Sequence, residues 1–242
     1  MSNDVRLAAI KARQKERKRV MRNLLKRVAI RCHCETVGGV GLPSKMPGTA
    51  YGISAHLCGV GGKLAEQEGS VCFKCYAKRN NYTYPSVIEA HAKRLASLGN
   101  WTEWIEAWSN IFTFLGANLP AEEWFHRWHD AGDLQGIEHL GAICEVARRN
   151  PEWSFWLPSK EYGVVGQYVA EWGLPGNITV RMSEPRKNAP PKPAVRKITG
   201  LTATVGHKEG PQCEAGKRGG FCDDCRICWD QSVANVNYTE IA

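Results

Sequence analysis

The sequence lacks the marks of a membrane-spanning or exported chain. No run of about 18 apolar residues occurs in its 242 residues, so no membrane span is predicted. Residues 1–20 are too charged for a secretory signal and have no apolar centre. No long tract has a disordered composition, and 43% of the residues are hydrophobic, which is enough for a core. The chain is therefore expected inside the cell, as one domain or one domain with a small appendage.

Acidic residues are scarce in the first part of the chain. Residues 1–31 contain 11 Lys and Arg against two acids, a net charge of +9, whereas the whole chain carries +8. The basicity therefore belongs to one segment. Residues 5–30 contain no Gly or Pro and are rich in Ala, Leu, Lys and Arg, which predicts a helix. Two interpretations of this helix stay open: a solvated helix packed by its ends, or a nucleic-acid contact in which cations neutralise phosphates.

Apolar runs alternate with helix-like segments through the rest of the chain. Each of five runs starts apolar and ends in polar residues: 51–58, 123–134, 153–162, 177–185 and 200–210. Helices are predicted between the first four runs, at 85–98, 101–115, 137–149 and 162–172, and a Pro-rich loop at 186–199. The alternation predicts an α/β fold with a parallel sheet whose strand ends carry the chemistry. Five strands are too few for an eight-stranded barrel, so an open, incomplete barrel is expected.

Ten cysteines in a reducing compartment favour metal binding over disulfides. The first group is Cys58, Cys72 and Cys75. A C-x2-C turn lets two thiolates reach one metal, and Cys58 arrives from the end of the first predicted strand. Three thiolates with an open fourth position suit a 4Fe–4S cluster, and a zinc ion is the alternative.

A second group of cysteines lies near the end of the chain. It has four members, enough to close a site, in the run Cys213, Cys222, Cys225 and Cys228. The C-x2-C-x2-C spacing is that of ferredoxin-type 4Fe–4S ligands, but a zinc knuckle also fits, so one or two clusters are predicted. Cys32 and Cys34 form a third, poorly spaced pair, and Cys144 is expected to be a buried core thiol.

Titratable residues gather at the ends of the predicted strands. The run HRWHDAGD follows the second strand, and its His129, Asp130 and Asp133 are the candidate catalytic residues, suited to holding a ligand or a proton near a cluster. The candidate cofactor-binding residues are cationic and could offset the charge of a thiolate-ligated cluster: Arg127, Lys160 and Arg181.

Four segments carry a resemblance to a known family. The runs SVCFKCYAKRNNY, RWHDAGDLQ, FWLPSKEY and CDDCRICWD resemble the phage-encoded family called gene product 88, which is similar to proteins of radical-SAM-like sequence. The resemblance covers about Thr36 to Trp229. It implies a partial (β/α) barrel of radical-SAM type, with Cys58, Cys72 and Cys75 at the cluster position after the first strand. The run AGDL then falls where that superfamily contacts S-adenosylmethionine.

Two departures limit what the resemblance implies. Radical-SAM enzymes usually have C-x3-C-x2-C, whereas the first gap here is 13 residues, and the Gly-Gly-Glu-Pro-like motif is reduced to AGDL. The resemblance therefore supports a cluster-binding fold more strongly than cleavage of S-adenosylmethionine.

Taken together, these features predict three parts: a basic helix at 1–35, a partial α/β barrel at 36–210 and a Cys-rich metal-binding segment at 211–242. The predicted function is a 4Fe–4S protein of the infected cell's cytoplasm, with redox or radical chemistry at the three-cysteine cluster. The alternative is a nucleic-acid-binding or host-interaction protein with structural metal sites. No membrane contact is expected, and the sequence predicts no oligomeric state.

Overall fold

A six-stranded parallel sheet forms the centre of the protein. The computed structural model describes residues 3–208 and 210–240, so Glu209 of the fifth predicted run lies outside the described residues. Neighbouring strands are parallel and follow chain order, and the sheet does not close: β1 (Thr49–Ala50), β2 (Phe125–Arg127), β3 (Ser154–Ser159), β4 (Ile178–Ser183), β5 (Thr202–Val205) and β6 (Asn235–Tyr238). The predicted α/β class and the open sheet are confirmed.

Helices surround this sheet. The α-helices are α1 (Asn3–Leu25), α2 (Val28–Thr36), α3 (Gly59–Leu64), α4 (Pro85–Ala96), α5 (Trp101–Asn118), α6 (Ile137–Arg149), α7 (Tyr162–Trp172) and α8 (Pro193–Thr199). Short 3-10 helices are η1 (Ala55–Leu57), η2 (Tyr76–Lys78), η3 (Asn80–Thr83), η4 (Ala121–Glu123) and η5 (Glu214–Arg218). Among the described residues, no helix is both long enough and apolar enough to cross a membrane.

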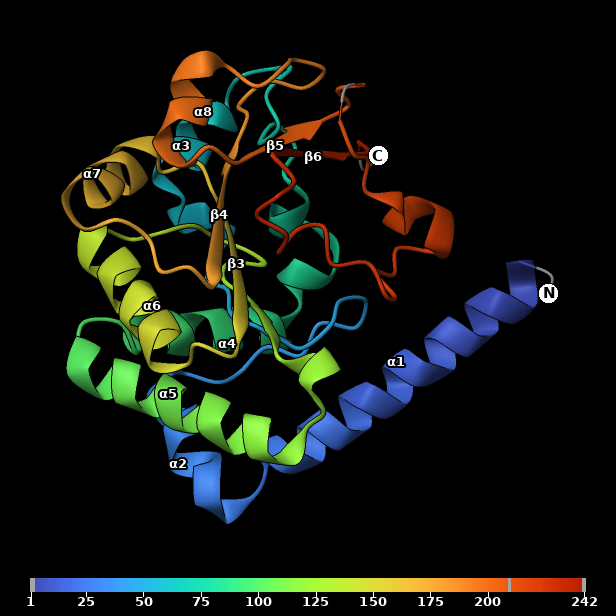
Figure 1. Ribbon diagram of the computed structural model, residues 1–242, viewed down its shortest axis with the longest axis vertical. Helices are drawn as coiled ribbons and strands as arrows, with labels where there is room; N and C mark the ends of the chain where they lie inside the picture. Colours follow the sequence, from blue (N-terminus) through green and yellow to red (C-terminus); the bar gives the residue numbers. More distant parts are fainter. Residues whose placement is uncertain (1–2, 209, 241–242) are drawn as a thin grey trace.

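The two faces of the sheet have different coverings. In Figure 1, α6 and α7 lie on one side of β3 and β4, and the C-terminal segment lies on the other. The helical side holds the main core, where the largest side chains are fully buried aromatics: Trp104, Trp108, Trp128, Trp153, Phe112 and Phe155. Burying a large aromatic side chain contributes about 2–3 kcal/mol, so this aromatic layer is the main source of stability for the helical side.

The C-terminal segment packs on the opposite face of the sheet. Trp229 lies against Trp156 at a ring distance of 5.1 Å, and its indole nitrogen donates to the His126 carbonyl at 3.1 Å. The Thr179 hydroxyl donates to the Trp229 carbonyl at 2.6 Å. Strand β6 then joins the sheet beside β5. The Cys-rich segment is therefore part of the domain and covers the face of the sheet opposite α6 and α7. We refer to this face as the inner face.

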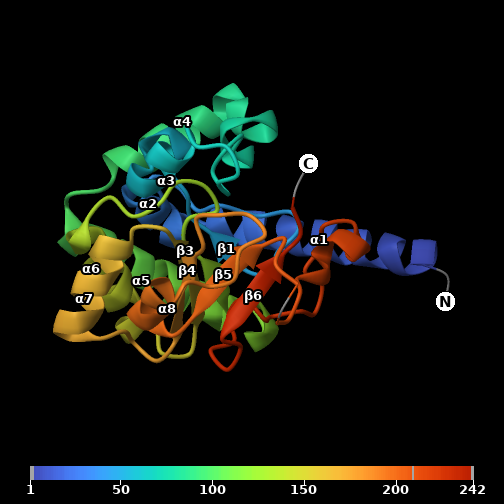
Figure 2. The same cartoon turned by 90° about the horizontal axis from the view of Figure 1, so that it is seen from above.

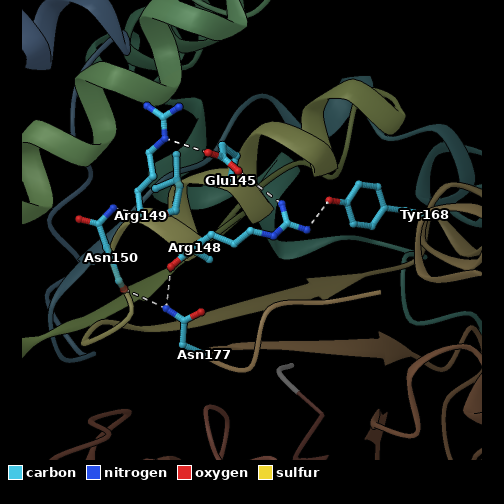
Figure 3. Close-up of polar contacts among 8 residues, drawn as sticks. Glu145, Arg148, Arg149, Asn150, Tyr168 and Asn177 are labelled. Carbon is cyan, nitrogen blue, oxygen red and sulfur yellow. Dashed lines mark hydrogen bonds and ion pairs between the residues drawn. The ribbon is translucent and has the colours of Figure 1, made fainter. Parts of the chain in front are cut away.

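Polar contacts fix the outer helices to the strand ends. The side-chain amide of Asn177 donates to three carbonyls, those of Ala147, Asn150 and Trp153, at 2.9–3.0 Å. Figure 3 shows this contact beside Arg148, which donates to the Tyr168 hydroxyl at 3.3 Å. Because Asn177 directly precedes β4, the end of α6 and the starts of β3 and β4 are held together.

The structure corrects four sequence predictions. The predicted helix over 5–30 is two helices, because Arg27 is extended (ψ 141°) and the turn lets both Leu24 and Ile30 reach the core. The predicted loop over 186–199 contains α8, which starts at Pro193, where a proline needs no N–H partner. The first strand precedes the predicted 51–58 run, since β1 ends at Ala50 and the run continues as extended chain and η1. The sixth strand, β6, was not predicted.

Candidate metal centres

The first cysteine group gathers around a glycine at the start of α3. Cys58 directly precedes α3, and Cys72 follows on the loop that leads to η2. A Cβ atom placed on Gly61 would lie 3.1 Å from the Cys58 Cβ and 3.5 Å from the Cys72 Sγ. Cys75 packs in the same small cluster as Cys58, beside Tyr82. The three thiols that were predicted as ligands are therefore brought together, and a side chain at Gly61 would make a tight contact with Cys58.

Backbone contacts fold the 58–75 loop back onto the sheet. Val71 donates to the Pro185 carbonyl at 2.9 Å, which ties the loop to the chain that leaves β4. The Ser70 hydroxyl donates to the Leu64 carbonyl at 2.5 Å and accepts from the Phe73 N–H at 3.0 Å. The C-x2-C turn is closed by the Cys75 N–H on the Cys72 carbonyl at 3.1 Å. The group thus stands at the carboxyl edge of the strands.

Asp133 joins the ends of β2 and β3 next to this group. Its carboxylate accepts from the Ser159 hydroxyl at 2.7 Å and from the Lys160 N–H at 2.9 Å. Burial raises the pKa of Asp133 to about 6, and these hydrogen bonds oppose the rise. Burial also raises the pKa of Cys58 to about 12, with Asp133 adding to the rise and the Lys160 cation opposing it. Asp133 and Lys160 therefore lie where the sequence predicted them, beside the first cysteine group.

Glu161 is a second carboxylate at this edge. Its Oε1 accepts from the Val60 N–H at 2.9 Å, and both carboxylate oxygens are 3.2 Å from the position of a Gly59 Cβ. This bond fixes the first turn of α3 and hence the backbone next to Cys58. The sequence had shown Glu161 only as a polar residue at a strand end, and nothing in its spacing pointed to a partner about a hundred residues away.

The structure does not bring His129 to the cysteines. His129 is buried, adopts a left-handed φ of 56°, and packs on Tyr51 and His139 in the aromatic core. Both of its ring nitrogens lack a hydrogen-bond partner within the described residues. Burial lowers its pKa well below the ordinary value, so the ring is neutral. His129 therefore lies in the core below the carboxyl ends of the strands, and not at the edge of the sheet where the cysteines lie.

Asp130 lies between the core and the first cysteine group. Its backbone carbonyl accepts from the hydroxyls of Tyr76 at 3.0 Å and Tyr82 at 3.4 Å, and Tyr82 packs beside the cysteines. Its Oδ1 is buried without a partner among the described residues and stands 2.1 Å from the position of a Gly52 Cβ. The two tyrosines, whose hydroxyls orient this turn, were not predicted as site residues.

Arg127 lies between the two cysteine groups. Its guanidinium is 4.5 Å from the centre of the Trp156 ring, and Nη1 is 3.5 Å from the Met46 sulfur. Burial opposes its charge, but acidic groups around it raise its pKa on balance: Tyr76, Asp130, Tyr82 and Tyr238. Towards the second group, the same cation opposes the rise that burial causes in the pKa of Cys222 and Cys228. Its fixed positive charge therefore acts on the second cysteine group.

The second cysteine group lies on the inner face of the sheet. Burial raises the pKa of Cys222 to about 11, and the neighbouring Cys213 and Cys225 add to it. Burial raises the pKa of Cys228 to about 12, and its sulfur is 3.1 Å from the Tyr238 hydroxyl. The backbone of Cys213 is tied to Asn237 of β6 at 2.7 Å. The four predicted ligands are thus brought together under one covering segment.

Arg181 belongs to this second group and not to the first. It is fully buried, and its guanidinium donates to five backbone carbonyls, four of them in the Cys-rich segment: Ile227, Cys228, Asp230, Val233 and, on β5, Thr202. The sequence predicted a cofactor-binding cation at this position. The structure places it as the anchor of the segment that carries Cys228.

All ten cysteines are free thiols. Within residues 3–208 and 210–240, no three His, Cys, Asp or Glu side chains converge at the spacing of a single metal ion. Cys144 is buried in the main core, as predicted. Cys32 and Cys34 lie on α2, where Cys32 is exposed and the Cys34 sulfur is 4.0 Å from the Leu25 carbonyl.

Comparison with known proteins identifies the family. The family model described as gene product 88 matches residues 10–231, which is most of the chain. No curated protein and no solved structure gives a match. The family match includes both cysteine groups and the strand-end residues around them. The chain therefore belongs to the gene product 88 family.

Proposed function

We propose that this chain is an iron–sulfur protein in which Cys58, Cys72 and Cys75 hold a 4Fe–4S cluster. The observation that carries the proposal is the gathering of three free thiols at the carboxyl edge of a parallel sheet, where Cys58 and Cys72 lie beside Gly61 and Cys75 packs in the same small cluster as Cys58. Ligands of open parallel sheets bind at that edge. When bound, such a cluster would supply one-electron chemistry through an iron that no cysteine occupies.

The donor set at the first centre fits a cluster. Thiolates are the ligands of iron–sulfur clusters, and the C-x2-C spacing of Cys72 and Cys75 lets two of them come from one turn. Burial raises the pKa of Cys58 and Cys72, and the Lys160 cation opposes this rise and so favours the thiolate form that a metal requires.

The sheet supports a radical-SAM-like ancestry. Six parallel strands in chain order, unclosed and covered by helices on one side, are what a partial (β/α) barrel of that type requires. S-adenosylmethionine enters the proposal only as a ligand to be tested. The side chains that would meet its charged groups are Asp130, whose Oδ1 is unpartnered among the described residues, and Arg127.

The second centre is proposed as a metal site of structural or electron-transfer type. Four thiols leave no open position, and Arg181 donates to the Ile227, Cys228 and Asp230 carbonyls of the segment that carries them. Iron–sulfur cluster and zinc are both compatible with four thiolates. We place the protein in the cytoplasm of the infected cell, where its thiols stay reduced.

Metal analysis after anaerobic purification tests the proposal. About four iron and four sulfide per chain indicate one cluster, and about eight of each indicate two. We expect Cys72→Ser to remove one cluster and Cys32→Ser, an exposed thiol outside both groups, to remove none. Zinc without iron in the wild-type protein would contradict the proposal. Iron that is unaffected by Cys72→Ser would move the cluster away from the first centre.

A second candidate function is nucleic-acid binding through α1. The observation that favours it is charge: residues 1–31 carry a net +9, and most of the Lys and Arg side chains of α1 are exposed. Cations on an exposed helix can neutralise phosphates without reading bases. Binding that weakens steeply with added salt supports this function, and binding that is indifferent to salt contradicts it.

A further inference from the structure

One face of α1 is a continuous ridge of cations. Lys11, Lys15, Lys18 and Arg22 follow one another at i, i+4, i+7 and i+11, so they line the same side of the helix over about 16 Å. Three of the four side chains are exposed and Lys18 is half-buried. We refer to these four residues as the α1 ridge. None of them has a hydrogen-bond or ion-pair partner in the described part of the chain.

The cations of the α1 ridge repel one another. Like charges at i, i+4 destabilise a helix, and the ridge contains two such pairs, Lys11 with Lys15 and Lys18 with Arg22. Burial lowers the pKa of Lys18, and the neighbouring Arg22 cation lowers it further. The nearest acid that pairs on this helix, Glu16, binds Arg19 instead, at 2.6 Å. A bound polyanion would relieve this repulsion.

The ridge is not suited to a lipid surface. A helix that lies on a membrane inserts an apolar face beside its basic face. Ile10, Met21 and Leu24 of α1 are buried in this protein, and the exposed Val5 and Val20 do not make a continuous apolar face. Figures 1 and 2 both show the N-terminal end of α1 projecting beyond the rest of the molecule. The exposed surface is therefore cationic and accessible, which fits a phosphate backbone.

Other side chains of α1, outside the ridge, contact the Cys-rich segment. A Cβ placed on Gly219 would lie 3.0 Å from the Leu7 Cδ1, and Arg13 pairs with Asp223 at 2.5 Å. Both Gly219 and Asp223 lie between the cysteines of the second centre or next to one of them. Farther along, Arg17 is mostly buried and pairs with Glu123 at 2.9 Å. The N-terminal half of α1 thus takes its orientation from the segment 213–228.

We propose that the α1 ridge binds the phosphate backbone of nucleic acid, and that metal at the second cysteine centre holds the ridge in its binding position. The inference rests on the metal site proposed above for Cys213, Cys222, Cys225 and Cys228. Metal orders the segment on which α1 is seated, so removal of the metal costs ordering when nucleic acid binds. By linkage, bound nucleic acid raises the affinity of the second centre for its metal by the same factor.

Fluorescence anisotropy with a labelled DNA duplex of about 20 base pairs tests the ridge. The full chain is titrated at several salt concentrations, with metal content measured on the same sample. We expect K11Q/K15Q/R22Q to weaken binding at least tenfold and to reduce the salt slope by about 3, one for each lost phosphate contact. The matched control is K192Q/R196Q/K197Q, which removes three exposed cations around α8 and should bind as the wild type does.

The metal dependence is tested with Cys225→Ser and with chelator-treated wild type. Both should bind the duplex at least about fivefold more weakly than the metal-loaded chain, the lower end of ordinary coupling between two sites. Removal of the metal from K11Q/K15Q/R22Q should not weaken its duplex binding further, because the binding of this variant no longer depends on the position of α1.

The outcomes separate the two claims. Equal binding by the ridge variant and the wild type overturns the ridge, as does tighter binding to phosphatidylserine vesicles than to the duplex. If the second centre holds metal but the metal-free and metal-loaded proteins bind the duplex equally, the coupling is overturned and the metal site is retained. A second centre without metal in the purified protein contradicts the metal site and, with it, the coupling.

Discussion

The two cysteine groups are held by the fold in different ways. The first lies on the loop 58–75 at the carboxyl edge of the sheet, tied down by single contacts such as Val71 to Pro185 and Glu161 to Val60. The second lies on a segment that fills the inner face of the sheet and is anchored by four hydrogen bonds from Arg181. The first arrangement suits a reactive site with an open position, and the second suits a permanent part of the fold.

The largest effect is expected at the anchor of the second group. Arg181→Met leaves five buried carbonyls without their donor, so we expect a loss of about 3–5 kcal/mol in the free energy of unfolding. The loss is measured by urea unfolding, together with metal content. Arg148→Met, on the outer helical face, is the control and should cost less than about 1 kcal/mol. Wild-type stability in Arg181→Met would show that the inner segment is not anchored as described.

Acid should weaken the helical side of the sheet, which lies under the first group. Burial lowers the pKa of His139 to about 4 and lowers those of His126 and His129 well below 6.5. A depressed histidine pKa gives stability that is complete above about pH 6.5 and is lost as the pH falls towards the folded value. His139 alone predicts a loss of about 2 kcal/mol between pH 7 and pH 5.

Asp133 has the opposite effect on the pH dependence of stability. Its pKa is raised from 3.8 to about 6, so its contribution is lost as the pH rises from about 4 to 6 and it partly offsets the histidines. Urea unfolding of wild type and His139→Gln at pH 7, 6 and 5 separates the two effects. The variant should have a flatter pH profile than the wild type. A wild-type stability that is constant from pH 7 to pH 5 would contradict neutral, buried histidines.

Two neighbouring glycines of α3 allow a matched test of the first group. A Cβ on Gly61 meets Cys58 and Cys72 at 3.1 and 3.5 Å, whereas one on Gly62 meets nothing within 4 Å. We expect Gly61→Ala to lower the iron held by the first centre by about half or more, with a stability change of about 1 kcal/mol. Gly62→Ala should retain full iron. Equal iron in the two variants would mean that the thiols do not enclose a bound group near Gly61.

The smallest effect is expected where α1 meets the second group. Arg13 is 67% exposed, so its ion pair with Asp223 is worth less than about 1 kcal/mol. Arg13→Gln should leave both the unfolding midpoint and the metal content close to those of the wild type. A large loss of metal in this variant would show that α1 supports the second centre more strongly than the reverse.

The sequence predicted those parts of the fold that depend on local pattern. The apolar runs at 153–162 and 177–185 became β3 and β4, since buried parallel strands are nearly continuous in apolar residues. Strand β6 escaped prediction because it is short and alternates two apolar residues, Val236 and Tyr238, with two asparagines. Asn235 and Asn237 hydrogen-bond to Thr202 and Thr204 across the strand pair, and such a ladder leaves no apolar run. Helix α8 was hidden by the prolines around it.

The site residues follow the same rule: those that depend on local pattern were predicted, and those that depend on distant contacts were not. Both cysteine groups were predicted because short spacings place thiols together whatever the rest of the fold does. The role of Arg181 was not, because its acceptors are backbone carbonyls about 50 residues away, and carbonyls leave no trace in a sequence. His129 was predicted at the mouth but lies in the aromatic core, since strand alternation alone does not say which face is the core.

The central claim is that the first group holds a 4Fe–4S cluster without help from the second. The most direct measurement is the iron and acid-labile sulfide content of Cys225→Ser, purified anaerobically, because this variant disables the closed centre and isolates Cys58, Cys72 and Cys75. About four iron and four sulfide per chain are predicted, and they should disappear in the double variant with Cys72→Ser. Iron-free protein, or zinc in place of iron, would contradict the claim.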